Sequence, residues 1–94
     1  MDKLEKISIA LNTFSECVED AGRVEHMAIF CITQLPEDDK SVGNQGIIAG
    51  APKDLGVMLM SQMSRNRVIR DLVLASALMF PEFDSKHGDE LRKK

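Results

Sequence analysis

The chain has 94 residues, enough for one domain, and 44% of them are hydrophobic and 29% charged, which is the balance of a soluble globular protein. A net charge of −3 with no Trp or Tyr argues against a nucleic-acid-binding protein, because such proteins usually carry a basic stripe or aromatic stacking platforms. The longest apolar stretch, residues 72–80, is far shorter than the roughly 20 residues of a membrane span. With no apolar signal core at the N-terminus, we expect a cytoplasmic protein that binds neither nucleic acid nor membrane.

The first predicted element is a helix over residues 2–21. Its apolar residues recur at alternating spacings of three and four, which places them on one stripe: Leu4, Ile7, Leu11, Phe14, Val18 and Ala21. Asp2 is expected to cap the helix, with Glu5 three residues later as in a capping box, and Gly22 is expected to end it. Such a stripe favours a helix that packs on a sheet or on a partner helix.

Two strands follow in the prediction. Residues 24–35 are rich in β-branched and aromatic types and end at Pro36, and residues 27–32 are apolar at every position, so both faces of this strand need cover. Residues 37–44 are expected to form a polar loop that turns at Gly43 and Asn44, and residues 46–50 a second, antiparallel strand. Because a lone hairpin is marginal in water, helices or a second copy must support it.

Two helices complete the prediction. Pro52 suits the first position of a helix, whose apolar side is Leu55, Met58, Leu59 and Met63. The pattern breaks near residues 64–67, where Ser64 or Asn66 is a candidate cap; one continuous bent helix over residues 52–80 is the alternative. Residues 72–80 are so densely apolar that the last helix is expected to be buried nearly all round. We expect Pro81 to end it and residues 82–94 to form a charged, flexible tail.

The predicted fold class is therefore α+β: an N-terminal helix, an antiparallel β-hairpin, and two C-terminal helices or one bent helix, in a single domain over residues 1–81. The doubly apolar strand and the apolar last helix carry more hydrophobic surface than a chain of this size easily hides. We therefore expect a homo-oligomer, most simply a two-fold dimer, in which the sheet is completed or covered.

The sequence offers no catalytic or metal-binding constellation. Cys17 and Cys31 lack the close spacing of a metal site and are expected to stay as free, buried thiols. His26 is expected at the edge of a strand and His87 in the tail, and neither belongs to a nucleophile signature. The acidic run that begins at Glu37 lacks the alternating spacing of a calcium loop. We therefore expect no catalytic residue, no metal and no cofactor.

The first candidate ligand-binding segment leads from the hairpin into the helix that begins at Pro52. Gly46 and Gly50 allow a ligand to approach the backbone, the N-terminus of the helix favours an anion, and Lys53 adds a positive charge. The alternative is purely structural: Gly43 makes the hairpin turn, while Gly50 and Pro52 mark the junction of strand and helix.

The second candidate is the basic group Arg65, Arg67 and Arg70. The ordinary interpretation is solvated charge on a helix, with Arg67 paired to Asp71 four residues later. In the sharper interpretation the guanidinium groups bind an anion such as a nucleotide phosphate at a subunit boundary. In an oligomer, the two candidates would then share one pocket.

The sequence is compatible with functions of three different classes. The preferred one is a non-catalytic accessory protein, a homo-oligomer that captures or sequesters a small anionic ligand such as a nucleotide. The alternative is a protein-interaction module or regulator that presents a Leu/Met-rich helix face, through Leu11 or Met79, to another protein. The third, a small enzyme with a site between subunits, is supported by no group of residues.

Overall fold

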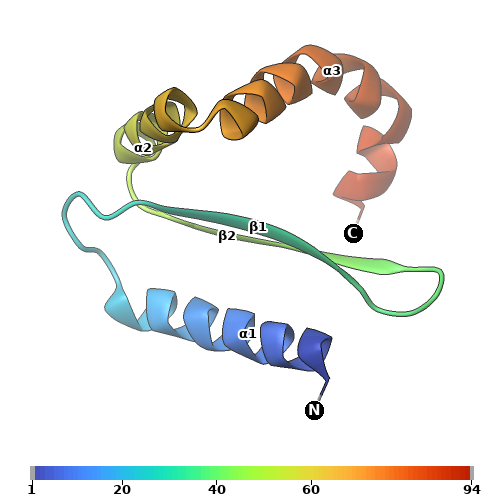
Figure 1. The fold of residues 1–94 in the computed structure, drawn as a ribbon, viewed down its shortest axis with the longest axis horizontal. Helices are drawn as coiled ribbons and strands as arrows, with labels where there is room; N and C mark the ends of the chain where they lie inside the picture. The colour runs from blue at the N-terminus through green and yellow to red at the C-terminus, as the bar shows by residue number, and fades with distance from the viewer. Residues whose placement is uncertain (1, 94) are drawn as a thin grey trace. The chain divides into compact units, whose positions relative to one another are not determined.

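The computed structural model describes residues 2–93, in which an N-terminal helix, a two-stranded antiparallel hairpin and two further helices follow one another (Figure 1). The elements are α1 (Lys3–Ala21), β1 (Ile29–Pro36), β2 (Val42–Ala49), α2 (Pro52–Arg65) and α3 (Arg67–Arg92). This is the predicted α+β order. The chain forms two compact units, of which the first ends at Val57 and the second begins at Met58.

Helix α1 has the predicted ends. The Asp2 side chain accepts a hydrogen bond from the Glu5 backbone N–H at 2.8 Å, which satisfies one of the donors that the first turn of a helix leaves free. At the other end Gly22 adopts a φ of 63° and donates its N–H to the Glu19 carbonyl at 3.2 Å. Glycine suits this left-handed position because it has no Cβ.

The hairpin starts later and turns earlier than predicted. Residues 25–26 form a turn before β1, with His26 at a φ of 64°. The chain reverses at residues 37–41, where the Asp38 carboxylate accepts hydrogen bonds from the N–H groups of Lys40 and Ser41 at 2.7 and 2.9 Å. Gly43 is not a turn residue but lies in β2 opposite Leu35. The local hydrogen bonds of an aspartate thus define this turn.

One face of the hairpin is covered and the other is open. Helix α1 lies along the covered face (Figure 1), to which alternate residues of β1 belong: Ile29, Cys31, Thr33 and Leu35 are half-buried. Ile47, opposite Cys31, is the most enclosed hydrophobic residue described, at 9% exposure. On the open face Phe30, Ile32 and Ile48 are 51%, 68% and 65% exposed. The expected cover on both faces of β1 is therefore present in the first unit on one face only.

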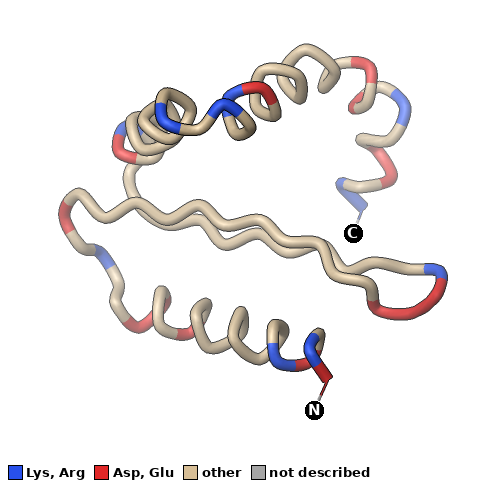
Figure 2. Tube along the Cα trace, in the orientation of Figure 1, with Lys and Arg blue, Asp and Glu red and all other residues tan. Residues whose placement is uncertain are grey.

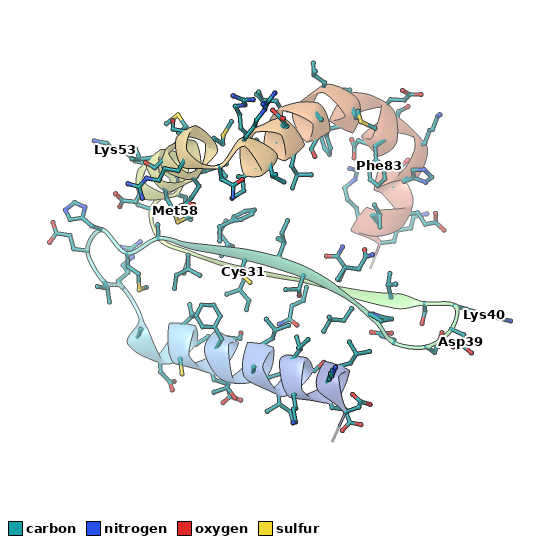
Figure 3. The ribbon with its side chains drawn as sticks, viewed as in Figure 1. Cys31, Asp39, Lys40, Lys53, Met58 and Phe83 are labelled. Atoms are coloured by element: carbon teal, nitrogen blue, oxygen red, sulfur yellow. The ribbon has the colours of Figure 1, made fainter. Side chains whose placement is uncertain are left out.

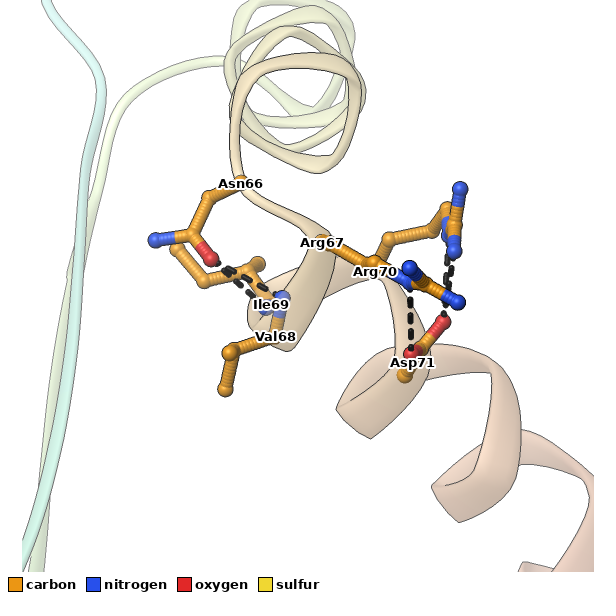
Figure 4. A network of polar contacts seen from close by, with 6 residues as sticks. All are labelled: Asn66, Arg67, Val68, Ile69, Arg70 and Asp71. Atoms are coloured by element: carbon orange, nitrogen blue, oxygen red, sulfur yellow. Dashed lines mark hydrogen bonds and ion pairs between the residues drawn. The ribbon is translucent and has the colours of Figure 1, made fainter.

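The two C-terminal helices are separate, and Asn66 forms the break. Its side-chain oxygen accepts hydrogen bonds from the backbone N–H groups of Val68 and Ile69 at 2.9 and 3.2 Å (Figure 4). Its own φ of −132° and ψ of 107° are extended, so α2 cannot continue through it. Of the two alternatives from the sequence, the structure contains two helices capped at Asn66 and not one bent helix.

Helix α3 corrects the prediction for the C-terminal part of the chain. It continues through Pro81 to Arg92, although a proline inside a helix removes one hydrogen bond and costs about 3 kcal/mol. Figure 1 shows that α3 curves along its length, as helices do around a proline. Beyond Pro81 the helix carries ion pairs from Lys86 to Glu82 at 3.1 Å and from Arg92 to Asp84 at 2.7 Å. Residues 82–92, expected as a tail, are helical.

The predicted burial of residues 72–80 is also wrong for the single chain. Leu72, Leu78, Met79 and Phe80 are all exposed. These residues are as apolar as a buried helix requires, but composition alone does not place a partner surface against a helix. The hydrophobic side chains of α3 therefore lie on the surface of the second unit.

Replacement of Asn66 by Ala should remove the cap of α3. Loss of a capping side chain costs about 0.5–2 kcal/mol, so Asn66→Ala should lower the urea midpoint of unfolding and reduce helicity in circular dichroism. Asn66→Asp keeps the acceptor oxygen and serves as the control. Equal loss in both variants would contradict the capping role.

The hairpin turn should weaken in acid. The N–H group of Lys40, followed by the hydroxyl and N–H of Ser41, holds the pKa of the Asp38 carboxyl below its ordinary value of 3.8. A pKa that is lower in the folded state stabilises the turn above pH 3.8, and that contribution is lost as the pH falls further. Amide NMR shifts of Lys40 and Ser41 should follow this titration in the parent protein but not in Asp38→Asn, and a titration in both would contradict it.

Candidate functional site

The described residues contain no group of three or more His, Cys, Asp or Glu side chains placed to hold a metal ion. Cys17 is exposed, against expectation, whereas Cys31 is half-buried; both are free thiols. His87 lies on α3 beside Phe83, with ring centroids 5.0 Å apart. Within residues 2–93, no helix is long and apolar enough to cross a bilayer.

The start of α2, the first candidate segment, is built tightly around Gly50. This residue has a φ of 116°, and a Cβ added to it would collide with the Met27 carbonyl oxygen and lie 3.0 Å from the Ala28 Cα. Gly50 is therefore required by the backbone itself. Lys53 projects from the first turn of α2 (Figure 3), and its side chain forms no ion pair within the part of the chain that the structure describes.

The charges at the start of α2 are mixed and do not select an anion, since Arg23 lines the same cavity as Glu25 and Asp54. A cavity of about 620 Å³ is lined by residues of the loop between α1 and β1 and by Gly50 and Asp54. His26 stands between two carboxylates there, 3.4 Å from Glu25 and 3.6 Å from Asp54. The Asp54 carboxylate already occupies the first turn of α2, where a helix attracts negative charge. Gly46 lies four residues before Gly50 within β2, about 13 Å away along a strand.

Helix α2 separates the two candidate sets. Lys53 stands in its first turn and Arg65 at its last residue, and twelve positions of an α-helix span about 18 Å. A single phosphate cannot bridge these two side chains. Within one chain, the structure therefore does not bring Lys53 and the arginines together.

The arginines gather where α2 ends and α3 begins. Arg70 donates two hydrogen bonds to one oxygen of Asp71, at 3.1 and 3.0 Å, while Arg67 lies 3.9 Å from the other oxygen (Figure 4). The predicted pair of Arg67 and Asp71 is thus present, although Arg70 is closer. Arg65 is exposed and makes no side-chain ion pair among the described residues. Asp71 contacts two of these three guanidinium groups, so the three arginines and Asp71 together carry a net positive charge.

A pocket of about 470 Å³ adjoins this cluster. It is lined by Met60, Met63, Ser64, Arg70 and Leu74. The first three share one side of α2 through spacings of three and four, and the last two share one side of α3. A guanidinium and a hydroxyl thus meet apolar walls, which is the mixture that binds an anion with an apolar or aromatic part. We define this set of five residues as the arginine pocket.

The sequence pattern identifies Arg70 as a ligand-binding candidate but not the other walls of the arginine pocket. It places Met63 on the apolar side of α2, and it assigns Met60, Ser64 and Leu74 to no binding site. Their helical spacings are visible in the sequence, but the angle between α2 and α3 depends on Asn66 and not on those spacings.

No protein-family model, no curated protein and no solved structure matches this chain.

Proposed function

We propose that this chain is a small non-catalytic binding protein that captures a small anionic ligand, such as a nucleotide, as part of a homo-oligomer. The observation that supports capture is the arginine pocket, where Arg70 and Ser64 share a 470 Å³ pocket with Met60, Met63 and Leu74. This pocket is shallow and open to solvent, and it combines apolar walls with few polar groups, as small-ligand sites do.

The charge balance supports an anion as the ligand. Asp71 compensates one of the three guanidinium groups of Arg65, Arg67 and Arg70. Arginine forms paired hydrogen bonds with phosphate or carboxylate, and its charge persists at every physiological pH. Nε and Nη2 of Arg70 bond to Asp71, so a phosphate would bind the remaining N–H groups of its guanidinium. The base of a nucleotide would then lie against the methionines, whose flexible side chains adapt to flat rings.

In a homo-oligomer, residues at the start of α2 in one copy would lie near the arginines of another. Lys53 lies in the first turn of α2, some 18 Å from its arginine end, and Gly46 and Gly50 precede the helix. A second copy whose α2 runs antiparallel would set its own Lys53 beside Arg65, and would also oppose the two helix dipoles favourably. Among the described residues of one chain, the candidate arginine that lines a pocket is Arg70.

Replacement of Arg70 by Gln should weaken capture. A hydrogen bond to a charged group contributes about 1.5–3 kcal/mol, so Arg70→Gln should raise the dissociation constant roughly 10- to 100-fold. Isothermal titration with a panel of nucleoside mono- and diphosphates, with inorganic phosphate alone alongside, measures it.

Lys86→Gln is the matched control, because it removes the same charge from α3 at an exposed position paired with Glu82. Equal weakening in both variants would show a general charge effect and contradict the pocket. If the parent protein binds no member of the panel and carries no retained anion in native mass spectrometry, capture is refuted.

The second candidate function is a protein-interaction module, and one surface favours it. Val68, Leu72 and Met79 lie along one side of α3 at spacings of four and seven, and are 75%, 63% and 69% exposed. Such a stripe fits a groove or a partner helix. We call it the α3 stripe.

Met79→Asp should abolish binding to a partner protein if the α3 stripe is its docking surface. Ala77→Asp adds the same charge on the opposite side of α3 and is the control. Capture of a protein from a cell extract by the parent and by Ala77→Asp, but not by Met79→Asp, supports the module. Capture by all three variants contradicts it.

A further inference from the structure

The hairpin is a two-stranded sheet with two free edges. In residues 2–93, β1 and β2 pair only with each other, so the outer edge of each strand is free. Neither strand contains a charged residue, and Figure 2 shows charges in the turn, in the helices and in the loop beside the hairpin but none along its strands. Natural sheets protect free edges with charges, prolines or bulges. Here only Pro36, the last residue of β1, serves that purpose.

The register identifies which backbone groups are free on β1. Glu37 donates its N–H to the Ser41 carbonyl at 3.0 Å, one step beyond the pairing of Pro36 with Val42. Because hydrogen-bonded and non-hydrogen-bonded pairs alternate in an antiparallel ladder, the odd-numbered residues of β1 bond to β2. The N–H and C=O groups of Phe30, Ile32 and Gln34 therefore point to the free edge. Pro36, which has no N–H, belongs to the same outward-facing set.

Within the described residues, the helices use their own backbone groups internally and no third strand is present. These edge groups are therefore open to water or to a strand of a second copy. The side chains beside the free edge favour a second copy. Phe30 and Ile32 are 51% and 68% exposed on the open face, and each suits the other as a cross-strand neighbour about a two-fold axis.

We propose that two copies of this chain pair antiparallel through the outer edges of their β1 strands and form one four-stranded sheet. The proposal rests on the homo-oligomer of the proposed function but needs no ligand. β1 is the favoured edge because residues 29–33 are β-branched or aromatic at four of five positions, whereas β2 contains Gly43, Asn44 and Gly46.

Pairing of apolar side chains selects the register of the two strands. With the two-fold axis at Cys31, Phe30 lies opposite the partner's Ile32, and Ile32 opposite the partner's Phe30. The open faces then join into one apolar surface with Ile48 from each copy. Phe30 and Ile32, whose N–H groups face outward, form the hydrogen-bonded pairs. Cys31 meets the partner's Cys31 in a non-hydrogen-bonded pair, at about 4.5 Å between Cα atoms, within the range that a disulfide bridges.

Disulfide cross-linking of the full chain tests the pairing and its register. In a Cys17→Ser background, mild oxidation should link Cys31 to the partner's Cys31 and yield a covalent dimer. The matched control moves the thiol by two residues on the same face, as Cys17→Ser/Cys31→Ser/Thr33→Cys. At position 33 the two thiols would lie four residues out of register, about 13 Å apart, and should not link. Linkage at position 33 but not at 31 overturns the register.

Solution mass without ligand tests the dimer itself. The parent should have twice the mass of one chain, and Ile32→Lys should return it to the 10.5 kDa of a monomer, because lysine on an edge opposes strand pairing. Ile48→Lys adds the same charge to the open face away from the β1 edge and should remain dimeric, with circular dichroism showing both variants folded.

A monomeric parent that does not link at position 31 overturns the proposal. If Ile32→Lys does not fold, the cross-linking pair alone decides. A linked dimer that binds no nucleotide or phosphate confirms strand pairing and refutes capture, so the two failures are distinguishable.

Discussion

The structure depends on one constraint: β1 is apolar on both faces, but α1 can cover only one. Strand side chains alternate between faces, and the five residues from Ile29 to Thr33 place large or thiol side chains on each in turn. The covered face includes Ile47, the most enclosed hydrophobic residue of the part described. The open face exposes Phe30 and Ile32 beside Ile48. Helix α1 supports the hairpin on one face, and the first unit leaves the apolar side chains of the other face exposed to a further surface.

The second unit also exposes an apolar surface, in this case along a helix. Its α3 stripe is exposed, and its ordered features are local: the Asn66 cap, the arginine pairs with Asp71 and the ion pairs beyond Pro81. The arginine pocket is the one place described in that unit where charge, hydroxyl and apolar walls meet. The proposed capture and the proposed self-association thus involve different surfaces, the arginine pocket for one and the apolar edge of β1 for the other.

The sequence correctly predicted features that depend on interactions between neighbouring residues. The Asp2 and Gly22 ends of α1 and the start of α2 at Pro52 each follow from one side chain and its nearby backbone. For the break between α2 and α3 the sequence left Ser64, Asn66 and one bent helix open, and the structure selects Asn66. Prediction failed where two local rules competed or where tertiary contacts decide. Asp38 forms the turn although glycine stands at position 43, and α3 continues through Pro81 because flanking turns of helix outweigh one lost hydrogen bond. The walls of the arginine pocket depend on the angle between two helices, which residue spacing does not encode.

Amide hydrogen exchange, read residue by residue in β1, tests the central claim most directly. The amides of Cys31 and Thr33 bond to β2 in any case, whereas those of Phe30 and Ile32 bond only if a second β1 is present. Strand pairing predicts that Phe30 and Ile32 exchange as slowly as Cys31 and Thr33, and that dilution to the monomer releases the first pair before the second. Fast exchange of Phe30 and Ile32 at every concentration, with Cys31 and Thr33 protected, would contradict it.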